Sequence, residues 1–271
     1  MKVTVLNGNL WKNYLATLGT IGIFTSFLTI FITIKDEYKF WTGIAFLFLL
    51  IVLFLYLLYR ANNQNAVTLN INGLKVNIYY GDLFNADGLK LVPFNEYFDT
   101  LVDNDIVAEN TLNGIFIKRR YPTTVANLDN EITRALTGIA STRNETRVKG
   151  KKDKYEIGTT IEVANKYIIT ALSRFDNQNR AVLTKGEYLL FLDNLWREIN
   201  RIYAQRDINI PLLGSGITRI GNDLKPQDYL EQILNSIKLS NIDNAYNTKL
   251  NIVLHESVKE HINLFDLKNK F

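Results

Sequence analysis

The sequence predicts an N-terminal transmembrane α-helical hairpin followed by an α/β domain in which helices sandwich a mixed β-sheet. Residues 15–34 and 40–59 are two runs of 20 residues without Asp, Glu, Lys or Arg, and only residues 35–39 separate them. At roughly 1.5 Å per residue, a helix of this length spans about 30 Å, the thickness of a bilayer's hydrocarbon core. Beyond residue 60, strand-like and helix-like segments alternate, as in α/β folds. We therefore divide the chain into residues 1–60 and 61–271.

The first apolar run is too long for a typical signal peptide and lacks a clear cleavage site, and the second run follows it at once. These features favour a retained hairpin over a cleaved leader. Lys2, Lys12 and Arg60 flank the two runs, whereas the connecting residues 35–39 carry two lysines and two acids. The positive-inside rule therefore favours a multi-pass protein with both ends, and hence the α/β domain, in the cytoplasm.

The first apolar run carries a stripe of small or weakly polar residues that the second run lacks. The stripe has spacings of 3, 4, 3 and 4 and consists of Gly19, Gly22, Ser26, Thr29 and Thr33. Small residues let helix backbones approach closely in lipid, and hydroxyls can bond across helices. The stripe can pack against the second helix of the same chain, or it can be an association seam between copies. The sequence favours neither. The second alternative predicts a homo-oligomer and allows a pore or a membrane-disrupting cluster.

The composition excludes several classes of function. The 31 basic and 27 acidic residues give a net charge of +4 and are intermixed, so there is no nucleic-acid footprint. The chain has no cysteine, which excludes disulfides and thiol chemistry. His255 and His261 are the only histidines, and their spacing fits no common metal motif, so no metal site is predicted.

The α/β domain begins with a predicted β-hairpin. Residues 67–71 and 74–80 are rich in β-forming residues, and Asn72-Gly73 between them is a strong type I′ turn signal. We expect residues 142–154, which are charged and poor in apolar residues, to be an exposed, solvated loop. The other predicted strands are 89–92 (stopped by Pro93), 159–163 paired with 167–172, 208–213 and 250–255. The predicted helices are 111–120, 127–136, 185–205, 226–239 and a terminal helix from Ser257.

Three strand ends could carry chemistry, because open α/β sheets bind ligands beyond the carboxyl ends of their strands. Asp82 follows the second strand and could accept hydrogen bonds from a ligand amino group, or simply cap a turn. The segment after residue 92 offers Asn95, Asp99 and Thr100 among aromatic residues, a composition suited to a ribose pocket or to an ordinary loop. A Gly-Ser-Gly turn at residues 214–216 can expose backbone N–H groups to a pyrophosphate.

The order of these segments resembles the macro domain over roughly residues 67–271. With the N-terminal hairpin, the chain looks like the macro-domain effectors of type II Thoeris antiphage defence. The resemblance implies that Asp82, with Leu83 beside it, contacts adenine, and that Asn95 lies near the distal ribose. It further implies a pyrophosphate loop of Gly214, Ser215, Gly216 and Ile217. Arg219 is our extension of that loop.

The resemblance also implies a function. The ligand would be an ADP-ribose derivative, for example an amino-acid conjugate, made by a TIR-domain partner upon infection. The chain, in the bacterial inner membrane, would then oligomerise and disrupt the membrane, causing abortive infection; no other cofactor is implied.

One departure from the family bears on catalysis. Hydrolytic macro domains usually carry an Asn-Ala-Ala-Asn segment leading into a run of glycines, whereas this chain has Pro93-Phe94-Asn95-Glu96 and no such run. The sequence therefore favours a binder without catalytic residues. A membrane-anchored ADP-ribosyl hydrolase is the alternative, with Asp99 to activate water and Glu96 as a weaker candidate. A third possibility is a structural tether with a vestigial pocket.

Overall fold

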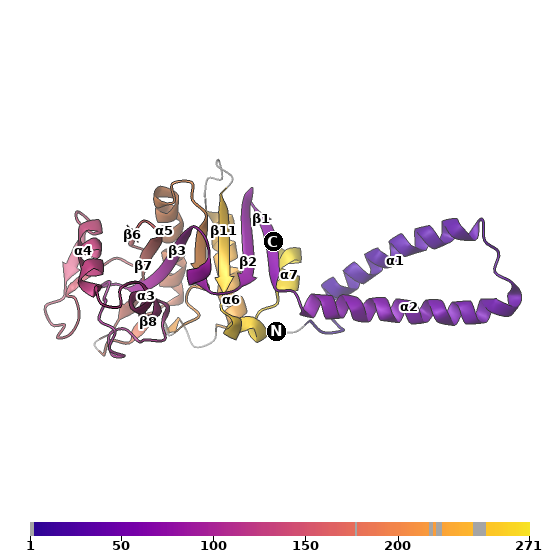
Figure 1. Ribbon diagram of the computed structural model, residues 1–271, viewed down its shortest axis with the longest axis horizontal. Coiled ribbons are helices and arrows are strands. Elements are labelled where there is room, and N and C mark those ends of the chain that lie inside the picture. Colours follow the sequence, from indigo (N-terminus) through magenta and orange to yellow (C-terminus); the bar gives the residue numbers. More distant parts are fainter. Residues whose placement is uncertain (1–2, 177, 217–218, 221–223, 241–247) are drawn as a thin grey trace. The chain divides into compact units, whose positions relative to one another are not determined.

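The computed structural model describes the chain apart from residues 1–2, 177, 217–218, 221–223 and 241–247 (Figure 1). The chain forms two packing units. The first consists of Met1–Val67 and Ile262–Lys270, and the second of Thr68–His261 together with Phe271. The last helix of the chain thus belongs to the unit that contains the N-terminal hairpin.

The first unit is a helical hairpin closed by a short C-terminal helix. It contains α1 (Gly8–Thr29), α2 (Asp36–Asn62) and α7 (Leu264–Lys270). Helix α1 begins seven residues before the apolar run, because the side chain of Asn7 caps it by accepting from the Leu10 N–H at 2.9 Å. It ends at Thr29, so the prediction of helix over residues 30–34 is wrong. Three of those five residues are isoleucine and one is threonine, and β-branched side chains disfavour helix.

The two long helices pack together near the open end of the hairpin. Leu10 is completely buried with Val3 and Ala61. The Tyr14 hydroxyl donates to the Leu50 carbonyl at 3.2 Å, and the Tyr14 ring meets the Phe54 ring edge to face at 5.2 Å.

Among the described residues, α2 is the helix that is long and apolar enough to cross a membrane; its 27 residues would span about 40 Å. Of the two predicted membrane-spanning helices, α2 has the length and hydropathy expected of a span, whereas α1 does not reach that hydropathy. Helix α1 is less apolar because of its glycines and hydroxyl residues. Its threonine hydroxyls nevertheless bond to carbonyls of their own helix, as in the bonds from Thr17 to Asn13 at 2.9 Å and from Thr20 to Ala16 at 3.2 Å. Such internal bonds lower the cost of a hydroxyl in hydrocarbon.

The second unit is built on a nine-stranded mixed sheet, with strands in the order β1-β2-β11-β9-β3-β7-β8-β10 and β6 beside β7. The pairs β2–β11, β11–β9, β9–β3, β3–β7 and β8–β10 are parallel, whereas β7 is antiparallel to β6 and β8. The bounds are β1 Ala66–Ile71, β2 Leu74–Tyr80, β3 Leu89–Asn95, β6 Thr160–Val163, β7 Tyr167–Phe175, β8 Ala181–Leu183, β9 Ile208–Pro211, β10 Arg219–Ile220 and β11 Lys249–Leu254. The carboxyl ends of β2, β3, β7, β9 and β11 therefore share one edge of the sheet.

The turn between β1 and β2 follows the sequence prediction. Asn72 and Gly73 both have positive φ, at 51° and 83°, as a type I′ turn requires. By contrast, the prediction that Pro93 stops a strand is wrong, because β3 continues to Asn95. Strand β9 pairs with β3 only at Leu89 and Lys90, so at Pro93 one side of β3 is locally an edge that needs no N–H donor.

Helices cover both faces of the sheet, as predicted. On one face, α3 (Leu112–Arg120) and α4 (Val125–Ala135) pack on β3, β6 and β7 around the buried Phe94 and Phe116. Helices α5 (Lys185–Ile202) and α6 (Pro226–Leu239) contact each other and cover the opposite face (Figure 1). Helix α5 starts with a capping box of Thr184 and Glu187, and α6 with Pro226 in its first turn.

Two predicted segments differ from the structure. Residues 142–154 are mostly exposed, as predicted, but they are more than a loop, since β4 (Ser141–Arg143) and β5 (Asp153–Tyr155) form an antiparallel pair and Arg147 between them is buried. The helix expected from Ser257 is a 3₁₀ segment, η2 (Glu256–His261), which precedes α7. The first difference arises from a contact distant in sequence, between Arg147 and Asp99, which local patterns do not encode.

Candidate functional site

Two adjoining cavities open at the edge of the sheet where β2, β3, β9 and β11 end. The cavity at the end of β2, the β2 cavity, has a volume of about 560 Å³ and is lined by residues that follow β2, β9 and β11 and by α3. The β3 cavity has a volume of about 260 Å³ and lies between the end of β3, residues 106–113 and residues 212–216. Both are lined by Asn110, Leu112, Leu212 and Ser215. They are therefore two parts of one crevice.

Asp82 lies in the β2 cavity at the start of η1 (Leu83–Asn85), next to the buried Leu83. One carboxylate oxygen accepts from the Phe84 N–H at 2.9 Å, and the other pairs with Nη1 of Arg119 at 2.8 Å. Partial burial raises the pKa of Asp82, but the bonds from Arg119 and Phe84 outweigh it, so the pKa lies below its usual value. Asp82 is thus both a cap and an ionised acceptor that faces the cavity.

Residues 214–216 line the β3 cavity, and Ser215 among them also lines the β2 cavity. Gly214 has a φ of 84°, and a Cβ there would lie 2.6 Å from Cδ1 of Ile220, so both backbone and space require glycine. Ile217 lies outside the described residues. Arg219 lies in β10, where its backbone pairs with Val182, and its side chain is not among the described ones.

This loop is held from two sides. The Ser215 hydroxyl donates to the Leu212 carbonyl at 2.8 Å, and the Tyr188 hydroxyl of α5 donates to the Leu213 carbonyl at 2.9 Å. Tyr188 is completely buried, and this burial raises its pKa, so the phenol keeps its proton and remains a donor. The start of the loop is therefore fixed both to Ser215 and to α5.

In the segment that ends β3 and follows it, one predicted site residue lines the crevice and the others lie elsewhere. Asn95 lines the β3 cavity, but its amide oxygen accepts from the Tyr97 N–H at 3.0 Å and its amide nitrogen donates to Asp99 at 3.1 Å. Asp99 is 1% exposed and lines neither cavity. Thr100 donates to Asp129 at 2.7 Å and lines a separate hollow of about 400 Å³. The structure thus brings Asp82, Leu83, Asn95 and residues 214–216 together, and leaves Asp99 and Thr100 apart from them.

Comparison with known proteins identifies the domain. The family model for the macro domain of Thoeris protein ThsA matches residues 76–255. Thoeris protein ThsA of Bacillus amyloliquefaciens (strain Y2) is 37% identical over 227 residues, which cover 82% of this chain and 75% of that protein.

The chain belongs to the ThsA macro-domain family.

Solved structures similar to this ThsA-family chain are more distant. The Oceanobacillus iheyensis macrodomain with MES bound has a TM-score of 0.47 at 14% identity, and the match covers 76% of this chain and 95% of that one. The same macrodomain with ADP has a TM-score of 0.46 at 14% identity, with the same coverage of both chains.

Sequence reasoning missed two arginines of this ThsA-family domain that pair with carboxylates considered for the site. Arg119, in the last turn of α3, pairs with Asp82, and its guanidinium carbon lies 5.2 Å from the centre of the Phe84 ring. His255 lines the β2 cavity, and its Nδ1 lies 2.8 Å from the Ser257 hydroxyl. Arg147 pairs with the buried Asp99 at 2.7 Å. No local pattern marks Arg119 or Arg147, because their partners lie 37 and 48 residues away.

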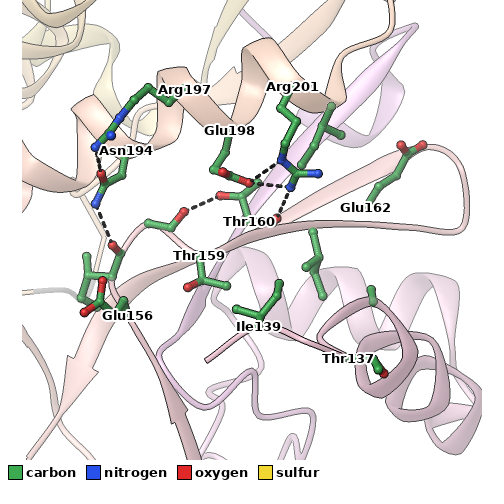
Figure 2. A pocket seen from close by; sticks show the side chains of 15 residues that line it. Thr137, Ile139, Glu156, Thr159, Thr160, Glu162, Asn194, Arg197, Glu198 and Arg201 are labelled. Atoms are coloured by element: carbon green, nitrogen blue, oxygen red, sulfur yellow. Dashed lines mark hydrogen bonds and ion pairs between the residues drawn. The ribbon is translucent and has the colours of Figure 1, made fainter. Parts of the chain in front are cut away.

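A larger groove of about 880 Å³ lies between α4, α5 and the edge strand β6 (Figure 2). Of its charged side chains, Arg201 binds Glu198 at 2.6 Å and Glu162 binds Arg206 at 2.6 Å. Because these groups already satisfy one another and lie away from the strand ends, the crevice is the stronger candidate. Within the described part of the chain, no group of three or more His, Asp or Glu side chains could hold a metal ion.

The stripe on α1 faces outward in the single copy. Nothing lies within 4 Å of a Cβ placed at Gly19 or Gly22, and Ser26 and Thr29 are not buried. Thr33 lies beyond the end of α1, so it does not share the helical face. Close packing of the stripe against α2 is therefore absent from the part of the chain that the structure describes. The association seam remains the alternative that the geometry allows.

Proposed function

We propose that this chain is a membrane-anchored receptor and effector of bacterial antiphage defence. Its macro domain binds an ADP-ribose-derived nucleotide that a TIR-domain partner makes upon infection. Binding drives association of the chains in the inner membrane, and the hairpin then disrupts the bilayer and causes abortive infection. The observation that carries this proposal is the crevice lined by Asp82 and the loop 214–216, in a chain of the Thoeris ThsA family with an apolar α2.

The chemistry of the two cavities supports an extended nucleotide. Asp82 offers an ionised acceptor to an amino group such as adenine N6 in the β2 cavity. The loop 214–216 lies where the cavities meet, which suits a pyrophosphate that joins two nucleoside halves. The described residues that line the β3 cavity carry no titratable side chain, so that cavity suits a ribose and an uncharged portion of its substituent.

A hydrolase reading requires a general base that faces the crevice. Asp99 is engaged by Arg147, by Asn95 and by the Lys151 N–H at 2.8 Å, and it does not line either cavity. This arrangement favours a receptor over an enzyme in which Asp99 activates water. A receptor must bind its ligand better in one assembly state than in the other, since only such a difference shifts the equilibrium.

The first test is calorimetric titration of the full chain with ADP-ribose. Asp82→Ala should weaken binding roughly 10- to 100-fold, because a hydrogen bond to a charged group contributes about 1.5–3 kcal/mol. Glu109→Ala is the matched control, since Glu109 forms a similar surface ion pair with Lys118 at 2.7 Å but lines neither cavity. Absence of ADP-ribose binding by the unmodified chain would contradict the proposal. Release of product during the titration would support the hydrolase instead.

The association seam makes a separate prediction. Replacing Gly19 and Gly22 by leucine should lower the population of oligomers in detergent severalfold, because bulky side chains separate closely packed helices. Gly43→Leu in α2 is the control, since a Cβ there also has no neighbour within 4 Å. Analytical ultracentrifugation would measure the result. If the two variants formed oligomers to the same extent, the stripe on α1 would not be an association seam.

A further inference from the structure

The C-terminal helix is fixed to the open end of the hairpin. The carboxylate of Asp266 accepts from the side-chain amide of Asn7 at 2.9 Å and from that of Asn9 at 2.8 Å. Phe265 packs on the cluster that contains Leu10 and Ala61. Residues at opposite ends of the chain thus form one surface, which we call the hairpin base.

The hairpin base is rich in exposed positive charge. Leu264 and Leu267 are buried, which leaves Lys268 and Lys270 exposed on α7. Lys12 follows Asn9 by three residues and Arg60 precedes Ala61, and both are exposed. The base therefore carries four basic side chains and one acidic one, Asp266, which already accepts hydrogen bonds from amides.

The opposite end of the hairpin has no such excess of positive over negative charge. Residues 35–39 there, which include the first turn of α2, carry two lysines and two acids, and Lys39 pairs with Asp36 at 2.6 Å. The difference in charge between the two ends of the hairpin is thus larger than the N-terminal sequence indicates, because α7 contributes two of the four basic side chains at the base.

Amphipathic and apolar side chains accompany the charge. Tyr56 and Tyr59 of α2 are 56% and 69% exposed. Leu6 is 87% exposed at the tip of a turn that Trp11 holds, with the indole N–H donating to the Val5 carbonyl at 2.8 Å. Tyrosine, tryptophan and lysine beside an apolar helix are typical of the boundary between hydrocarbon and lipid headgroups.

We propose that the hairpin base binds the headgroups of anionic phospholipids, with α7 as part of the surface. This inference rests on the proposed insertion of the hairpin into a membrane. The ammonium groups of Lys268, Lys270 and Lys12 and the guanidinium of Arg60 lie at the level of the lipid phosphates, while Leu6 and the tyrosines enter the interface. The charge of the base then fixes the orientation of the hairpin in the bilayer and holds the C-terminal helix at the membrane surface.

The test uses the full chain in vesicles of phosphatidylcholine, with or without phosphatidylglycerol, and counts retained phosphatidylglycerol by native mass spectrometry. The double variant Lys268→Gln/Lys270→Gln should weaken retention about fivefold per lysine, given the usual contribution of a basic residue at an anionic membrane. Lys35→Gln/Lys39→Gln is the matched control at the neutral end and should retain the lipid as the unmodified chain does. Asp266→Ala, which releases α7 but keeps its lysines, should reproduce the loss.

The outcomes separate the inference from the proposed function. Equal retention by the base variant and the control, in a protein that inserts into both vesicles, would overturn the lipid surface alone. A chain that inserts into neither vesicle would overturn membrane anchoring as well. Binding of ADP-ribose, measured in parallel, should be unchanged in all the lysine variants, and a normal thermal melt would show that each variant is folded.

Discussion

Arg147→Met should lower the free energy of unfolding of the macro domain by about 3–5 kcal/mol, because it leaves the buried carboxylate of Asp99 without its cation. The Arg147 side chain is 6% exposed, and its Nη2 lies 2.7 Å from Asp99. Its guanidinium carbon also lies 3.8 Å from the centre of the Tyr97 ring, so the loss includes a cation–π contact. In thermal unfolding of the full chain, the Tm of the domain should fall by about 10 °C.

The matched control is Arg143→Met, in the same β4–β5 segment. Arg143 pairs with Glu145 at 2.8 Å and with Asp153 at 3.2 Å, but it is more than half exposed. Surface pairs of this kind contribute little to stability because water screens them, so the control should melt within a few degrees of the unmodified chain. Comparable losses in the two variants would show that burial of the Arg147–Asp99 pair does not matter, contrary to our account of this segment.

Local patterns predicted much of the fold because several signals act within a few residues. The Asn72-Gly73 turn and the helix Pro226–Leu239 follow from backbone preferences that the chain carries locally. Pro93 led to a wrong prediction of where β3 ends. A strand can contain proline where the neighbouring strand does not pair with it, and the point at which β9 stops pairing with β3 is a property of the whole sheet. Likewise, the charged segment 142–154 is polar as expected, but one of its charges is buried by a partner 48 residues away.

In the candidate site, too, local sequence predicts some features and misses those that depend on distant contacts. Asp82 and residues 214–216 follow strands directly, so the parallel sheet brings them to one edge, as the rule for open α/β sheets predicts. Asp99 shares its segment with Asn95 but points into the interior, where Arg147 binds it. Nothing in the spacing of the sequence distinguishes a carboxylate that faces a ligand from one that anchors a loop. The docking of α7 on the hairpin depends on contacts between the two ends of the chain, which no local pattern contains.

Gly214→Ala should weaken ADP-ribose binding more than tenfold and lower the free energy of unfolding by about 2–4 kcal/mol. A non-glycine residue at a φ of 84° costs about 1–2 kcal/mol, and crowding in a packed site adds a similar amount. The new Cβ would lie 2.6 Å from Cδ1 of Ile220 and 3.0 Å from the Tyr229 ring. Relief of these contacts must displace the loop that lines the crevice. Calorimetry with ADP-ribose and chemical denaturation would measure the two effects.

Gly216→Ala separates backbone strain from simple crowding of the ligand. A Cβ at Gly216 meets nothing within 4 Å and its φ is not positive, so this variant should keep the stability of the unmodified chain. Because Gly216 lines the β3 cavity, a methyl group there can still reduce the room for a ligand, and a severalfold loss of affinity is expected. If Gly214→Ala instead bound ADP-ribose as tightly as the unmodified chain, the loop 214–216 would have no part in recognition, and the nucleotide would have to bind without it.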